Sequence, residues 1–93
     1  MIISFSHKGL QELFEKGKTK HLPQERIKKI KGLLTIINTA TIPRDFHLPK
    51  SRTHKLKKNP YIGFWSIDVS GNYRIIFKFE NGNATDVNYL DTH

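Results

Sequence analysis

The alternation of apolar and polar residues between positions 61 and 90 most constrains how this 93-residue chain can fold. Three segments, 61–69, 73–80 and 84–90, alternate with a period of two residues and are rich in aromatic and β-branched side chains, as is typical of strands. The turns 70–72 and 81–83 between them contain Gly and Asn, which readily adopt the positive φ angles of tight hairpins. The pattern therefore predicts an antiparallel meander. It also places three residues of the last segment on one face, namely Thr85, Val87 and Tyr89.

The N-terminal half is predicted to supply helices. Residues 1–6 are expected to form a short strand, and Lys8 to Lys16 a helix that Gly17 ends. A second helix is predicted between Pro23 and Pro43, because apolar residues recur there at helical spacing. These residues are Ile27, Ile30, Leu34 and Ile37. The chain is therefore predicted to be a single α+β domain, residues 1–93. Its two N-terminal helices should pack on one face of a mainly antiparallel sheet and leave the other face open.

The composition excludes several classes of protein. There is no cysteine, which excludes a disulfide scaffold, a thiolate zinc site and a cysteine nucleophile. No apolar run approaches the roughly 18 to 20 residues of a membrane span, and the N-terminus lacks the basic region of a signal peptide. No cofactor-binding fingerprint is present either. We therefore expect a cytoplasmic protein with no metal, no cofactor and no membrane-spanning segment.

Positive charge is concentrated in two segments. Of the 16 Lys and Arg residues, seven lie in residues 16–31 with one acidic residue, and six lie in residues 44–58 with one acidic residue. The rest of the chain has three basic and six acidic residues. A net charge of +8 gathered in this way favours a surface that binds an anionic partner over general solubilisation. The charge alone fits nucleic acid, an acidic protein segment or an anionic membrane surface. Residues 42–51, bounded by prolines, are predicted to be a basic connecting loop.

The C-terminal residues are the first candidates for chemistry. Asp91 and His93 follow a predicted strand and, in extended backbone, project to the same side. A histidine has an ordinary pKa of about 6.5, so it can accept and donate protons near neutral pH. The alternative is a solvated chain end without a role.

Two internal residues are further candidates. His54 lies in a lysine-rich run, where it either contributes to proton transfer or is an ordinary exposed residue. Arg74 lies in the middle of an apolar strand and needs an anionic partner, since a buried, unpaired guanidinium is costly. Asp86 on the neighbouring strand is one candidate partner, and a ligand is the other. Together, two histidines, a carboxylate, an arginine and lysines suit RNA cleavage in which the RNA supplies its own 2′-hydroxyl as nucleophile.

Several motifs resemble one toxin family. The sequence is similar to the HigB host-inhibition-of-growth toxins, also called plasmid maintenance killer proteins, of the RelE/ParE superfamily. The residues that carry the resemblance are Gly63-Phe64-Trp65-Ser66-Ile67, Tyr73-Arg74-Ile75-Ile76-Phe77-Lys78-Phe79, Asn81-Gly82-Asn83-Ala84 and Asn88-Tyr89-Leu90-Asp91-Thr92-His93, together with matching residues in segments 3–17 and 38–41.

The resemblance implies a RelE-like fold and a ribosome-dependent messenger RNA endonuclease that cuts codons in the decoding site. It also implies a HigA-type helix-turn-helix antitoxin, with operator DNA contacted only through the antitoxin complex. Where the family pattern commonly ends Asp-Tyr-His, this chain has Thr92, so codon preference or rate is expected to differ. Two alternatives are a ParE-like toxin that inhibits DNA gyrase and a non-catalytic RNA-binding module.

The resemblance also carries over site residues. The implied catalytic residues are His54, Lys57, Arg74, Asp91 and His93. The basic residues expected to contact RNA are Arg26, Lys28, Lys29, Arg52, Lys55 and Lys58. Strict strand geometry would place His54 and Lys57 on opposite faces, so both reach one site only if the backbone between them is irregular.

Overall fold

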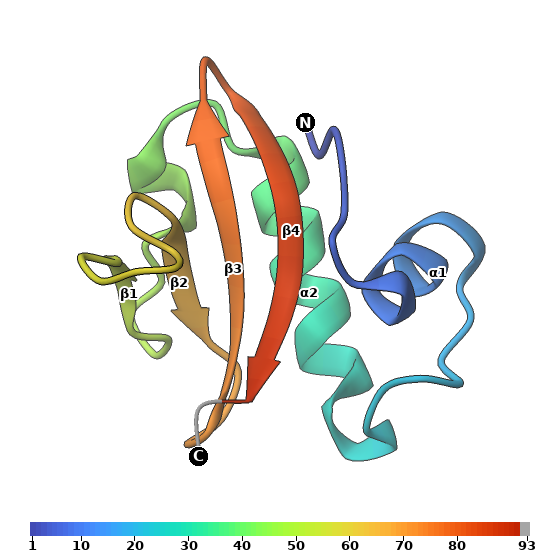
Figure 1. The fold of residues 1–93 in the computed structure, drawn as a ribbon. Helices are drawn as coiled ribbons and strands as arrows, with labels where there is room; N and C mark the ends of the chain where they lie inside the picture. Colours follow the sequence, from blue (N-terminus) through green and yellow to red (C-terminus); the bar gives the residue numbers. More distant parts are fainter. Residues whose placement is uncertain (92–93) are drawn as a thin grey trace.

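The computed structural model describes residues 1–91, which form a four-stranded antiparallel sheet with two helices on one of its faces (Figure 1). The predicted α+β arrangement is therefore confirmed. The helices are α1 (Lys8–Lys16) and α2 (Ile27–Thr39), and the strands are β1 (Thr53–Lys55), β2 (Trp65–Asp68), β3 (Tyr73–Glu80) and β4 (Asn83–Asp91). The strands are adjacent in chain order, β1-β2-β3-β4. Among residues 1–91, no helix is long and apolar enough to cross a membrane.

Local sequence signals explain where the first helix begins and ends. The imidazole Nδ1 of His7 accepts a hydrogen bond from the Leu10 N–H at 3.2 Å, which satisfies one of the free donors of the first turn. Gly17 ends α1 with a φ of 70°, a conformation that glycine adopts without strain. The bounds of α1 agree with the prediction, and α2 ends at Thr39, ahead of Pro43.

The core lies between the helices and one face of the sheet. Helix α2 buries the predicted residues Ile30, Leu34 and Ile37. Phe46 is fully buried and packs edge-on against Trp65, Phe77 and Phe79, with ring centroids 5.0 to 5.3 Å apart. It belongs to a 3₁₀ turn, Pro43–Phe46, within the connection that was predicted to be a loop. The connection therefore supplies the core with one of its largest side chains.

A bulge in β4 changes the face on which Thr85 lies. The register shifts between Ile76 and Lys78, where Asp86 adopts a φ of 52°. The extra residue turns Val87 into the core while Thr85 lies opposite Lys78 on the other face. The prediction that Thr85, Val87 and Tyr89 share one face is therefore wrong for Thr85.

Two strand predictions also change. Strand β2 contains only Trp65–Asp68 of the predicted segment 61–69, because residues 61–64 belong to the loop that follows β1. The N-terminal segment is not a continuous strand. It runs parallel to β4 and meets it at two isolated bridges, Ile2 with Ala84 and Phe5 with Val87.

Candidate active site

The sheet face opposite the helices carries two rows of side chains that cross the strands. In an antiparallel sheet, directly paired residues project from the same face. One row contains Asp68, Arg74 and Leu90, and the next contains His54, Ser66, Ile76 and Asn88. Both rows lie at the end of the sheet next to the hairpin between β2 and β3.

A hollow of about 670 Å³, here called the basic hollow, opens over these rows. Beyond β1, the chain stays paired with the segment before β2 through hydrogen bonds from Leu56 N–H to Phe64 O at 2.8 Å and from Gly63 N–H to Leu56 O at 2.9 Å. Among the residues around the basic hollow, Ile76 is apolar and fully buried. The residues that line the basic hollow are Arg52, His54, Lys55, Leu56, Lys57, Lys58, Asn59, Tyr61, Arg74, Ile76 and Leu90.

His54 and Lys57 both line the basic hollow, although strict alternation would separate them. Strand β1 ends at Lys55, so the alternation of a strand does not extend to Lys57. The backbone between His54 and Lys57 therefore departs from regular strand geometry, which is the condition for both residues to reach one site.

The surroundings of His54 favour its neutral form. Its Nδ1 is buried and has no hydrogen-bond partner among residues 1–91. Burial lowers the pKa of His54 below its usual value, and the positive charges of Arg52 and Arg74 lower it further, while Asp68 acts in the opposite direction. The imidazole is therefore mainly neutral at pH 7.

Arg74 lies beside Asp68 and not beside Asp86. The distance from Arg74 Nε to Asp68 Oδ1 is 3.9 Å, whereas the Asp86 carboxylate lies 3.3 Å from the Lys78 ammonium. The candidate structural partner named from the sequence, Asp86, is thus replaced by Asp68. Sequence reasoning overlooked Asp68 as a site residue, although residues 68 and 74 are equally distant from Gly71 and so face each other across the hairpin.

The other predicted residues divide between two faces. Arg52, Lys55 and Lys58 line the basic hollow, whereas three residues predicted to contact RNA do not. These are Arg26, whose guanidinium lies 4.9 Å from the Tyr73 ring centroid, and the exposed Lys28 and Lys29 of α2.

Of the C-terminal candidates, only Asp91 is among the described residues, and it does not line the basic hollow. Asp91 is the last residue of β4 and pairs with Tyr73, so it lies on the face opposite Arg74. His93 and Thr92 lie outside the described residues. No group of three or more His, Asp or Glu side chains in residues 1–91 is arranged to hold a metal ion.

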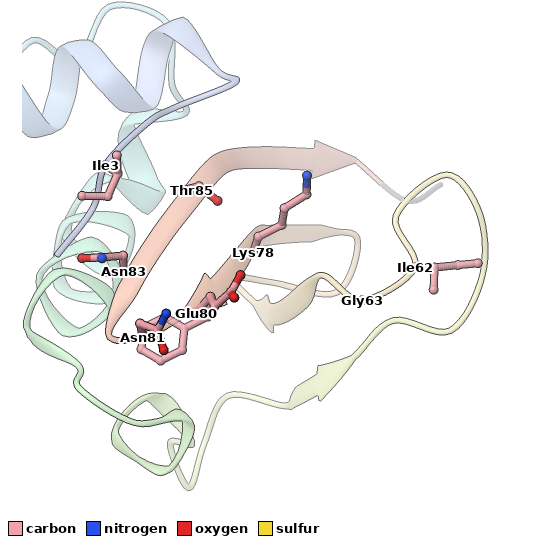
Figure 2. A pocket seen from close by; sticks show the side chains of 9 residues that line it. Ile3, Ile62, Gly63, Lys78, Glu80, Asn81, Asn83 and Thr85 are labelled. Carbon is pink, nitrogen blue, oxygen red and sulfur yellow. The ribbon is translucent and has the colours of Figure 1, made fainter.

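A second hollow of about 610 Å³ lies toward the turn between β3 and β4 (Figure 2). Its charged lining residues are Lys78 and Glu80, and it is also lined by Thr85 and, from the loop before β2, Ile62. It has neither a histidine nor an arginine in its lining. The basic hollow is therefore the better site for chemistry on a phosphodiester.

A small antiparallel sheet with two helices on one face is consistent with a RelE-like domain. The chain belongs to the family described as the RelE-like toxin of type II toxin-antitoxin system HigB, whose model matches residues 3–93. It is 44% identical to endoribonuclease HigB of Proteus vulgaris over 93 residues, which span 100% of both chains. It is also 29% identical over 94 residues to toxin HigB-1 of Vibrio cholerae serotype O1, covering 100% of this chain and 98% of the relative. The resemblance inferred from the motifs is thereby confirmed.

Proposed function

We propose that this toxin is a ribosome-dependent endoribonuclease that cleaves messenger RNA codons in the decoding site and so arrests translation. The observation that carries the proposal is a largely neutral histidine, His54, in a hollow that also contains Arg52, Arg74 and Lys57. A base and several cations are what cleavage of RNA by its own hydroxyl needs. The name of the Proteus vulgaris relative, endoribonuclease HigB, supports the same reaction.

In the proposed reaction, neutral His54 takes the proton of the 2′-hydroxyl. The 2′-oxygen then forms a bond to phosphorus, and the bond from phosphorus to the 5′-oxygen breaks. The products are a 2′,3′-cyclic phosphate and a 5′-hydroxyl. Arg74 and Lys57 stabilise the negative charge that develops on the phosphoryl oxygens. The nucleophile is part of the substrate, so the proposed step uses neither a metal nor a cofactor.

The leaving 5′-oxygen needs a proton donor, and His93 is the candidate. Asp91, which ends β4 on the face opposite Arg74, is proposed to orient or charge that imidazole from there. Residue 92 is a threonine, which offers no ring on which a base can stack. We therefore expect a codon preference or a rate that differs from relatives with an aromatic residue at this place.

The partners follow from the same proposal. Arg52, Lys55 and Lys58 are proposed to hold the messenger RNA, and Arg26, Lys28 and Lys29 to contact ribosomal RNA. Membership of a toxin-antitoxin family implies an antitoxin. We propose a helix-turn-helix antitoxin of the HigA type, through which alone the toxin would meet operator DNA, and a cytoplasmic location with the ribosomes.

The deciding experiment is primer extension on translated and untranslated versions of one transcript after expression of the toxin. Cuts confined to translated codons are expected. His54→Gln and His93→Ala should each reduce cleavage about 10²- to 10⁴-fold, the usual contribution of a general acid or base, while ribosome binding stays near that of the wild type. His21→Gln is the matched control, because His21 contacts Glu12 of α1 and does not line the basic hollow.

The pH dependence tests the assignment of the base. Because the pKa of His54 is lowered, cleavage should fall only when the pH drops below about 6.5, the ordinary histidine value.

Intact messages with blocked replication would instead indicate a gyrase inhibitor. Ribosome binding without cleavage in the wild type would leave a non-catalytic binding module.

A further inference from the structure

Asp68 lies beside the basic hollow, on the same sheet face as Arg74, and its strand runs between Arg52 and Arg74, which line the hollow. Its N–H donates a hydrogen bond to the Arg52 carbonyl oxygen at 3.0 Å, and its register partner on β3 is Arg74. Asp68 does not itself line the basic hollow, so it is placed to act on the arginines and not on the RNA.

The approach of Asp68 to Arg74 is close but incomplete. The Nε to Oδ1 distance of 3.9 Å is too long for a hydrogen bond, and both atoms are buried without a hydrogen-bond partner among residues 1–91. Most buried polar atoms in proteins have a hydrogen-bond partner, so two facing atoms without one call for an explanation. Since the carboxylate approaches at Nε, the terminal nitrogens of the guanidinium remain available for a phosphate.

Asp68 also opposes the positive charge around His54. Arg52 and Arg74 both disfavour the protonated imidazole, and Asp68 favours it. The lysines that line the basic hollow, Lys55, Lys57 and Lys58, add further positive charge. Without the Asp68 carboxylate, the charged groups around His54 named here would all be positive.

We propose that Asp68 is a positioning residue of this site: its carboxylate orients the Arg74 guanidinium toward the scissile phosphate and offsets the positive charge around His54. The proposal rests on the proposed RNA cleavage at His54 and Arg74. Its consequences for the free protein can nevertheless be measured without RNA.

The test compares Asp68→Asn with Asp86→Asn. Both remove one carboxylate from the same sheet, but Asp86 pairs with Lys78 outside the basic hollow. Asparagine tolerates the φ of 52° at residue 86. In an NMR titration of the free toxin, we expect the pKa of His54 to be lower in Asp68→Asn than in the wild type and unchanged in Asp86→Asn. Asp68→Glu, which keeps the charge, should titrate close to the wild type.

The second measurement is single-turnover cleavage on programmed ribosomes. Asp68→Asn should lower the maximal rate by about 10- to 100-fold, the loss expected when a group is misplaced by up to 1 Å, with little change in ribosome affinity. The acid limb of its pH profile should move to lower pH. Asp86→Asn should keep the wild-type rate.

The outcomes separate the two proposals. An unchanged His54 titration together with a wild-type cleavage rate in Asp68→Asn would overturn the role of Asp68. A shifted His54 titration in Asp68→Asn, together with a wild-type toxin that cuts no RNA, would support the electrostatic role of Asp68 and overturn the proposed function. If Asp68→Asn does not fold, Asp68→Ser, which is smaller and also uncharged, must show the same two changes, and its failure to do so overturns the proposal.

Discussion

His7 links the first helix to solution pH. Its Nδ1 must be unprotonated to accept the Leu10 N–H, and its pKa is lowered by burial and by the nearby His21. The unfolded chain therefore binds a proton at a higher pH than the folded chain does. The contribution of His7 to the free energy of unfolding is fully present above about pH 6.5. It is lost as the pH falls from there through the pKa of His7 in the folded state.

We predict that His7→Asn weakens this loss of stability. Asparagine is a favoured N-cap that does not titrate, so it retains the cap at low pH. The measurement is urea unfolding at pH 7 and pH 5. Some pH dependence remains, because the lowered pKa of His54 acts with the same sign. His7→Ala should lose about 1 kcal/mol through loss of the cap. Equal pH dependence in His7→Asn and the wild type would contradict this account.

The residues of the site were only partly predictable. His54 and Lys57 followed from the family motif, yet their meeting in one hollow depends on where β1 ends. Asp68 required attention to the residue that faces Arg74 across a hairpin. Such pairings arise from the register of two strands, which no single segment of sequence specifies.

The helices and strands were more predictable than their irregularities. Strand β3 and helix α1 have the predicted bounds, because a period of two or of 3.6 residues is visible within one segment. The bulge in β4 was not predicted, because it is stabilised from a distant part of the chain. The hydroxyl oxygen of Ser4 accepts the N–H of Asp86 at 2.9 Å, and these residues are 82 positions apart. Similarly, Phe46 has no periodic apolar neighbours that would mark it as part of the core.

The bulge gives a direct prediction for stability. Ser4→Ala removes the acceptor of the Asp86 N–H and should destabilise the protein by about 1 kcal/mol, measured by denaturant unfolding. Ser6→Ala is the control, because Ser6 is exposed and only its backbone N–H bonds to β4. It should change the free energy of unfolding by less than about 0.5 kcal/mol. Equal effects of the two substitutions would show that Ser4 does not hold the bulge.

The two basic segments lie on opposite sides of the sheet. The segment around residues 52–58 lies at the basic hollow, whereas Lys28 and Lys29 lie on α2, which covers the opposite face (Figure 1). The sequence predicted two basic segments, but not that they would be on different sides. Their placement depends on tertiary packing, since α2 must turn its apolar stripe to the sheet and its lysines outward. Under the proposed function the toxin acts within the ribosome, and both sides are then proposed to contact RNA.

The two sides should differ in the kinetic step that they affect. Lys28→Gln with Lys29→Gln should weaken ribosome binding and flatten its salt dependence, by a slope of about 0.7 for each phosphate that the variant no longer neutralises, without changing the rate of cleavage when bound. Lys57→Gln should lower that rate, because Lys57 lines the basic hollow. The measurements are binding at several salt concentrations and single-turnover cleavage at saturation. Lys8→Gln, an exposed change on α1 outside both basic segments, controls for the loss of one positive charge, half of the loss in the double variant. If the double variant changes the salt slope no more than Lys8→Gln does, then the outer side of α2 does not face RNA. The proposed binding surface would then be confined to the open face of the sheet.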